Sequence, residues 1–193
     1  MCVNGVDPQL KFSCYCQFIP PLFSLIQFGL IATLKSVPEI TLNVANSSFF
    51  INYTSTSVFS NGVRTFLYVQ SGLTLLYGLA TGILLFCGRL NERKWPLLVC
   101  TIANVLLGLL SFCTMCIAAN GARIMGGPAY LGAGSLNCAK IQSVDKKTCD
   151  TFATLLINSI KAHDQLIASS VFWLVDLVVF ALSATIIFLR YLI

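Results

Sequence analysis

The chain has 193 residues, of which 56% are apolar and only 10% are charged, with a formal net charge of +5. A soluble domain carries about 25% charged residues, and a chain of this size folded in water would still expose about a third of its surface. The composition therefore excludes a soluble enzyme, a nucleic-acid-binding domain and a disordered chain, and it indicates that lipid surrounds most of the protein.

Four apolar segments are long enough to cross a bilayer, whose hydrocarbon core takes about 20 helical residues. They cover approximately residues 12–34, 66–87, 95–119 and 166–189, and each contains few charges or none. In lipid a segment must satisfy its own backbone hydrogen bonds, so we expect each one to be a helix. The sequence therefore predicts an all-α membrane protein. It forms a single four-transmembrane-helix bundle over residues 1–193, with long outer loops at 35–65 and 120–165 and a short hairpin at 88–94.

The first span contains Pro20 and Pro21, so we expect its helix to be bent or broken there. It lacks the basic cluster and the small-residue exit of a cleaved signal peptide, and we expect it to be retained. Cys14 and Cys16 lie near one end of this span, and Cys87 lies at the end of the second. Cysteines at such positions are sites of reversible S-palmitoylation, and unmodified buried thiols are the alternative interpretation.

The loop at 35–65 contains two N-x-[ST] sequences, which begin at Asn46 and Asn52. Such sequences accept N-linked glycans in proteins that enter the secretory pathway. We therefore predict glycosylation at both asparagines and expect this loop to lie outside the cytoplasm.

The second span carries Gly78 and Gly82 in a GxxxG arrangement. In an apolar helix this spacing allows another backbone to approach closely, either inside the bundle or between two chains. The fourth span has small residues at Ala181, Ser183 and Ala184, so we expect the second and fourth spans to be a close pair.

The hairpin at 88–94 contains three basic residues, Arg89, Arg93 and Lys94. Basic residues close to the spans mark the cytoplasmic side of a membrane protein. The five basic residues of the loop at 120–165 are spread among acidic ones and therefore weigh less. We predict that both termini are cytoplasmic and that both long loops face the lumen or the outside.

The third span contains Cys113 and Cys116 in a C-x-x-C spacing, which occurs in metal and redox sites. No second C-x-x-C pair accompanies them, and the sole histidine, His163, lies in the loop at 120–165. Because a structural zinc ion needs a full set of such ligands, we expect both cysteines to act as small apolar residues. The sequence predicts no metal and no cofactor.

The loop at 120–165 holds Cys138 and Cys149, the only cysteines in either long loop. We predict that they form a disulfide in an oxidising compartment. The bond would close a ring of about 12 residues and contribute about 3 kcal/mol by the chain-entropy estimate. Glycines between Gly126 and Gly134 predict a flexible piece of this loop near the membrane.

Apolar residues after Cys149 follow helical spacing, at Phe152, Leu155, Leu156 and Ile160. They predict an amphipathic helix that continues into the fourth span. We expect its apolar stripe to pack against the loop at 35–65, and a partner surface is the alternative.

The fourth span contains Asp176, about ten residues from its start. An ionised aspartate at the centre of a membrane helix costs about 2.5–3.5 kcal/mol, so it should face the bundle and have a partner. The partner candidates are uncharged polar residues of the other spans: Gln27, Gln70, Thr74 and Asn104. Their neutrality favours a protonated or hydrogen-bonded carboxyl group over an ion pair. One interpretation is an interhelical hydrogen bond that fixes packing, and the other is a proton or cation site.

The sequence contains no P-loop, no G-x-S-x-G and no H-E-x-x-H motif. His163 and Asp164 are neighbours, which is a weak signal for a catalytic base. We therefore expect a protein that is not an enzyme and has no catalytic residues.

The four-span layout, the short charged hairpin, the cysteine pair and the last span together resemble the MARVEL-type tetraspan membrane proteins. That group includes synaptophysins, synaptogyrins and Casparian-strip-like proteins. In the last span, small residues at 168–170 precede Phe172 and Trp173, as in the closing helix of the group. The resemblance implies a role in vesicle trafficking, junctions or membrane apposition, in the plasma membrane or in a secretory or vesicular membrane.

The expected function is therefore to organise a membrane or to accompany a larger membrane assembly. The expected partners are the lipid bilayer and other membrane proteins, or a second copy of the chain, which meet it through helix faces and outer loops. We expect no nucleic acid. The alternative is a channel, a transporter or an accessory subunit of one, with Asp176 as its intramembrane polar site.

Overall fold

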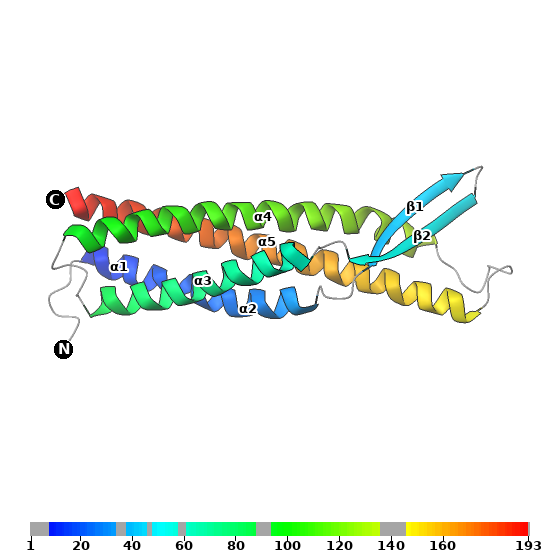
Figure 1. Ribbon diagram of the computed structural model, residues 1–193, viewed down its shortest axis with the longest axis horizontal. Helices are drawn as coiled ribbons and strands as arrows, with labels where there is room; N and C mark the ends of the chain where they lie inside the picture. The colour runs from blue at the N-terminus through cyan, green and yellow to red at the C-terminus, as the bar shows by residue number, and fades with distance from the viewer. Residues whose placement is uncertain are drawn as a thin grey trace.

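The computed structural model describes residues 8–33, 38–45, 48–57, 61–87, 94–135 and 146–192. The elements are, in chain order, α1 (Pro8–Gln17), α2 (Ile19–Thr33), β1 (Pro38–Ala45), β2 (Ser48–Ser57), α3 (Asn61–Phe86), α4 (Lys94–Ser135) and α5 (Lys146–Leu192). Figure 1 shows an elongated bundle in which α4 and α5 run side by side and α1, α2 and α3 cover part of their length.

Four segments are long and apolar enough to cross a membrane: Lys11–Ala32, Gly62–Phe86, Lys94–Gly126 and Ala153–Leu192. The predicted four-helix membrane architecture is therefore confirmed. The first span is made by α1 and α2 together, whereas each of the other three spans lies within one long helix.

The first span is interrupted at Phe18, between α1 and α2. Pro20 and Pro21 have no N–H groups, so they cannot donate to the carbonyl groups one turn earlier. The backbone tightens at this point, and the Phe18 N–H donates to the Tyr15 carbonyl oxygen at 3.2 Å. Proline is tolerated in the first turn of the new helix, where N–H groups have no intrahelical acceptor. The break therefore lies where the sequence predicts it.

Buried positions in α4 and α5 alternate at spacings of three and four residues. In α5 this seam is Ser159, Ala162, Leu166, Ser169, Trp173, Asp176, Phe180, Ser183 and Ile187. In α4 it includes Leu97, Cys100, Asn104, Leu107, Ser111, Thr114, Ala118 and Met125. A repeat of about 3.5 residues keeps one face of each helix against its neighbours along a left-handed supercoil. The two helices therefore stay in contact over most of their length.

The same spacing continues in the other two spans. The first contributes Ser13, Gln17, Pro20, Ser24, Gln27 and Ile31, and α3 contributes Leu67, Ser71, Thr74, Gly78, Thr81 and Leu85. Most of these side chains are small or polar, whereas large apolar residues such as Leu22, Leu76 and Leu109 are exposed on the outside of the bundle. This arrangement suits helices surrounded by lipid, where close approach and interhelical hydrogen bonds drive association.

The GxxxG glycines of α3 pack against the first span. A Cβ atom at Gly78 would lie 2.7 Å from the ring of Pro21 and 2.9 Å from the Gln17 carbonyl oxygen, and one at Gly82 would lie 2.9 Å from the ring of Phe18. The expected close pairing of the second and fourth spans through small residues is therefore wrong. The break in the first span presents a proline ring and a phenylalanine ring to α3, and only glycine leaves room for them.

The helices α4 and α5 are 42 and 47 residues long. At about 1.5 Å per residue they extend about 63 and 70 Å, roughly twice the thickness of a hydrocarbon core of about 30 Å. We call the part beyond the spans predicted from the sequence, residues 120–135 and 146–165, the outer stalk; it overlaps the ends of the two apolar segments that reach Gly126 and begin at Ala153. In this stalk α4 continues as a helix from Gly126 through Gly134, so the predicted flexible piece is wrong.

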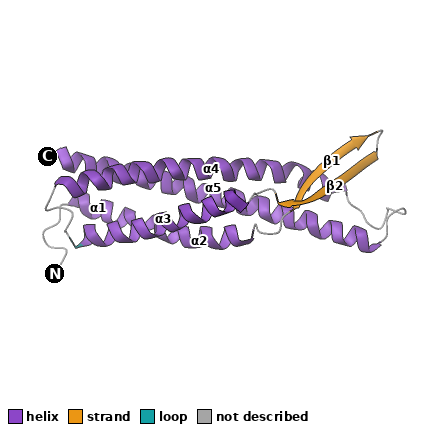
Figure 2. Cartoon of the chain, viewed as in Figure 1, coloured by secondary structure: helices purple, strands orange, loops and turns teal. Residues whose placement is uncertain are grey.

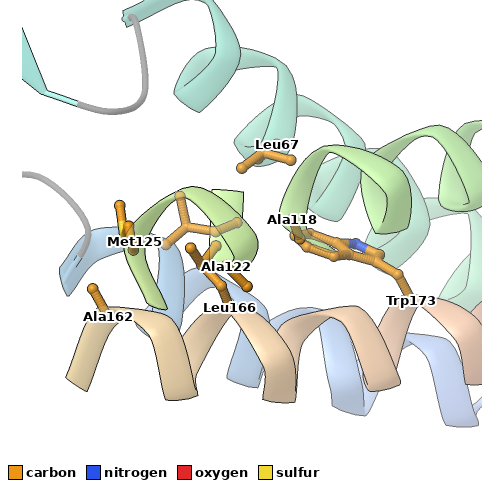
Figure 3. Packing of buried hydrophobic residues seen from close by; sticks show 8 residues of the cluster. Leu67, Ala118, Ala122, Met125, Ala162, Leu166 and Trp173 are labelled. Carbon is orange, nitrogen blue, oxygen red and sulfur yellow. The ribbon is translucent and has the colours of Figure 1, made fainter. Parts of the chain in front are cut away.

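Packing against α5 holds α4 up to the start of its glycine-rich part. Ala122 and Met125 lie against Ala162 and Leu166 of α5 in one apolar cluster (Figure 3). A Cβ atom at Gly126 would lie 2.6 Å from the ring of His163. Contacts with a neighbouring helix commonly outweigh weak helix propensity. The predicted helix after Cys149 that runs into the fourth span is observed. Its main neighbour is α4, and not the loop at 35–65 as expected from the sequence.

Strands β1 and β2 form an antiparallel hairpin in the loop predicted at 35–65 (Figure 2). The register pairs Ala45 with Ser48 and Thr41 with Asn52, with one irregularity between Pro38 and Glu39. The hairpin lies within the predicted outer loop, and the other described elements are helices, in agreement with the predicted all-α class. Alternation of apolar and polar residues between Ile40 and Val44 is the strand signal that the sequence carries.

The contact between Gly78 and the first span gives a direct test of this packing. We expect Gly78→Ala to lower the stability of the bundle by about 1–3 kcal/mol, because neither the Pro21 ring nor the Gln17 backbone can move aside cheaply. The measurement is the thermal unfolding midpoint of the purified chain in detergent. Gly29→Ala is the matched control, since a Cβ atom there has no neighbour within 4 Å. Equal midpoints for the two variants would contradict the packing described.

Candidate functional site

Asp176 is the one acidic side chain among the buried residues that the structure describes. It lies on the seam of α5 and is 0% exposed. The Nε2 of Gln27, on α2, donates a hydrogen bond to Asp176 Oδ2 at 3.2 Å. Of the partner candidates that the sequence proposes, Gln27 is the one bonded to Asp176 in the structure.

One set of hydrogen bonds runs from Asp176 through Gln27 to α3, and a separate bond from the adjacent residue of α3 reaches α4. Ser71 Oγ, on α3, donates to Gln27 Oε1 at 3.3 Å. Its neighbour Gln70 donates through Nε2 to Ser111 Oγ, on α4, at 3.3 Å. These five residues, Gln27, Gln70, Ser71, Ser111 and Asp176, are at most 1% exposed and come from all four spans. We call them the Asp176 layer.

The remaining candidates for a partner of Asp176 are bonded to other groups. Gln70 also donates to Thr74 Oγ1 on its own helix at 3.4 Å. Asn104 accepts a hydrogen bond at 2.7 Å from the side-chain amide of Gln17, next to the break in the first span. Thr81 Oγ1 in turn lies 3.3 Å from Gln17 Oε1. Gln17, Thr81 and Asn104 therefore form a second polar cluster, which we call the Gln17 cluster.

Sequence analysis did not single out Gln17, Ser71, Thr81 or Ser111. The signal that could have found them is the spacing of polar residues in the first span, where Ser13, Gln17, Ser24 and Gln27 follow the same seam. A polar residue that recurs at seam positions of a membrane helix faces other helices rather than lipid.

Two buried oxygen atoms of the Asp176 layer lack a hydrogen-bond donor. Asp176 Oδ1 and Gln70 Oε1 are buried and have no hydrogen-bond partner. A carboxylate can accept about four hydrogen bonds, yet Gln27 supplies a single neutral donor. No lysine or arginine is among the buried side chains that the structure describes. A negative charge on Asp176 is therefore not balanced by any of these buried side chains.

Trp173 lies one turn before Asp176 on the same face of α5. Its indole lies beside Ala118 of α4 (Figure 3), in the same apolar cluster as Leu67 of α3, and its Nε1 has no hydrogen-bond partner. Ser169 and Ser183 on the same seam also have unpartnered hydroxyl groups. Several polar groups on the buried face of α5 therefore lie outside the hydrogen bonds of the Asp176 layer.

The three cysteines considered for palmitoylation differ in exposure. Cys14 is buried and its thiol donates to the Gly82 carbonyl oxygen at 3.3 Å. Cys16 is also buried, whereas Cys87 is exposed at the end of α3. Acylation of Cys14 or Cys16 would require the bundle to open, and Cys87 is the one of the three that is exposed.

Other predicted sites fall partly outside the described residues. Cys138 and Asn46 lie outside them, and for Cys149 and Asn52 the structure describes the backbone alone, so the disulfide and the glycans stay predictions. Cys113 and Cys116 are exposed on the outside of α4. Within the described part of the chain, no three histidine, cysteine, aspartate or glutamate side chains are grouped to hold a metal ion.

His163 serves to pack the outer stalk. Its Nδ1 lies 2.7 Å from the Ala122 carbonyl oxygen of α4, and its ring covers Gly126. Its sequence neighbour Asp164 is exposed on the surface of α5. The ring is therefore held between α4 and α5.

No family model, curated protein or solved structure matches the chain. The chemistry of the site follows from its geometry alone. The Asp176 layer is enclosed by four helices, and its side chains are suited to hold charge and hydrogen bonds inside the bundle rather than to meet a large substrate.

Removal of the Gln27 donor tests the bond to Asp176. We expect Gln27→Leu to lower the free energy of unfolding by about 1–3 kcal/mol, because it leaves a buried carboxyl group without its donor. The double variant Gln27→Leu/Asp176→Leu should recover most of this loss, since both polar partners are then absent. Unfolding midpoints in detergent measure both effects. Additive losses in the double variant would show that the two side chains are not coupled.

Proposed function

We propose that this chain is a non-enzymatic four-span membrane protein that organises a membrane or accompanies a larger membrane assembly, and that it meets protein partners through the outer stalk. The observation that carries the proposal is the length of α4 and α5, which extends the helix pair well beyond a bilayer. A packed helix pair of this length is a rigid support for a binding surface outside the membrane.

The surface of the outer stalk supports this proposal. Its exposed side chains include the polar residues Asn120, Arg123, Asn158, Lys161 and Asp164, together with the apolar residues Ile124 and Ile157. The hairpin of β1 and β2 lies beside α4 at this end of the molecule (Figure 1). Stalk and hairpin together present polar groups and strand edges, both of which proteins use for recognition.

The membrane orientation expected from the sequence and the resemblance to a known family both support this proposal. The basic residues at 88–94 favour a cytoplasmic location for the start of α4. This orientation supports an outer stalk in the lumen or outside the cell, on the side of the two sequons. The resemblance to MARVEL-type tetraspan proteins suggests vesicle trafficking, junctions or membrane apposition. The membrane is then the plasma membrane or a secretory or vesicular one.

A channel or transporter is the second candidate, and the unpartnered oxygen of Asp176 is the observation that favours it. A buried carboxyl group in a membrane helix commonly marks an ion or proton pathway. We rank this candidate second because the Gln17 cluster and the Asp176 layer join neighbouring helices by direct hydrogen bonds.

Site-specific photocrosslinking in intact cells tests the proposal. A crosslinker at the exposed stalk position Asn158 should give discrete protein adducts, and the charge reversal Lys161→Glu should abolish them without changing the amount of protein in the membrane. Both side chains are exposed on α5. A crosslinker at Ile102, which is 52% exposed on the outside of α4 within the third span, is the control and should react mainly with lipid.

Two results would contradict the proposal. The first is the absence of protein adducts from Asn158. The second is an ion or proton flux in liposomes that contain only the purified chain and that lose the flux on Asp176→Asn, because this result would make transport the function.

A further inference from the structure

Two buried oxygen atoms of the Asp176 layer have no hydrogen-bond partner. They are Oδ1 of Asp176 on α5 and Oε1 of Gln70 on α3. Both side chains are at most 1% exposed. A buried acceptor without a partner costs free energy, and this layer contains two of them around one carboxyl group.

The groups that face Asp176 do not supply a positive charge. Gln27 from α2 is bonded to Asp176, and Ser71 from α3 is bonded to Gln27. Gln70, next to Ser71 on α3, and its partner Ser111 on α4 complete the layer, and all four side chains are neutral. An isolated ionised carboxylate in an apolar environment is very costly, and such a group either takes up a cation or becomes neutral. The layer therefore has surplus oxygen atoms and lacks one unit of positive charge.

We propose that the Asp176 layer is a binding site for one small monovalent cation, a proton or Na⁺, between the carboxyl group of Asp176 and the amide oxygen of Gln70. Carboxylate, amide and hydroxyl oxygens are the ligands that hard cations prefer, and Ser111 Oγ adds a hydroxyl oxygen beside Gln70. A site with one carboxylate and otherwise neutral oxygen ligands balances one positive charge, which favours a monovalent cation.

The bound cation would stabilise the whole bundle, because the layer draws residues from all four spans. This inference is independent of the function proposed above: a bound cation needs no pathway across the membrane, and contacts at the outer stalk need no cation. Failure of one therefore leaves the other intact.

The test is the thermal unfolding midpoint of the full-length chain in detergent. In one arm Na⁺ replaces choline at constant pH and ionic strength, with K⁺ as a comparison. In the other arm the pH is raised in choline alone. A ligand that binds only the folded state raises its stability with concentration, so the midpoint should increase by several degrees with Na⁺ or fall by several degrees as protons are removed.

Variants connect the response to the site. Asp176→Asn should remove the response in both arms, because the neutral amide needs no cation. Asp164→Asn is the matched control: it removes an exposed carboxylate from the same helix and should respond like the natural chain. Gln70→Leu keeps the carboxyl group of Asp176 but removes the amide oxygen of Gln70. The Na⁺ or proton concentration at which the midpoint responds half-maximally should then shift at least tenfold.

Each outcome decides the proposal. A response to Na⁺ but not K⁺ identifies Na⁺ as the ligand, and a response to pH alone identifies the proton. A flat midpoint of the natural chain in both arms overturns the proposal, as does a response that persists in Asp176→Asn. Should Asp176→Asn fail to fold, Gln70→Leu decides in its place, and an unchanged half-maximal concentration then overturns the site.

Discussion

Lipid as the surrounding solvent is the constraint on which this structure depends. A leucine gains little by moving from lipid into a membrane bundle, so the helices cannot be held together by burying large apolar side chains. Small and polar residues occupy the seams instead, at alternating spacings of three and four residues, while Leu22, Leu76 and Leu109 face outward. This distribution, with small and polar residues inside and large apolar residues outside, accounts for the main contacts of the bundle. They are the hydrogen bonds of the Asp176 layer and of the Gln17 cluster, and the close approach at Gly78.

The break in the first span and the glycines of α3 are two parts of one contact. Pro20 and Pro21 interrupt the helix, and the Pro21 ring then fits over Gly78 while Phe18 covers Gly82. The side chain of Gln17, at the end of α1, bonds to Asn104 across the bundle. The break in the first span is thus packed against the glycines of α3 and hydrogen-bonded to Asn104 of α4. This explains how a doubly proline-interrupted segment is held at membrane depth.

Sequence reasoning predicted the features that depend on one segment at a time: the four spans, the break at Pro20, the helix after Cys149 and a polar partner for Asp176. It did not predict the features that depend on the register between helices. Gln27, Gln70 and Asn104 are equally polar, and only the packed structure assigns Gln27 to Asp176 and Asn104 to Gln17. The glycines near Gly126 predicted a flexible piece because propensity alone omits the neighbouring α5, whereas the alternation around Ile40 did indicate a strand and was overlooked.

The continuity of α5 has a mechanical consequence. The helix passes without interruption from Lys146 in the outer stalk to Leu192, and Asp176 lies inside it. Lys161 and Asp176 are separated by about four helical turns of the same rod. No break in the helix separates the two residues. The exposed end of α5 and the buried carboxyl group of Asp176 therefore belong to one continuous rod, and the helix cannot change direction between them.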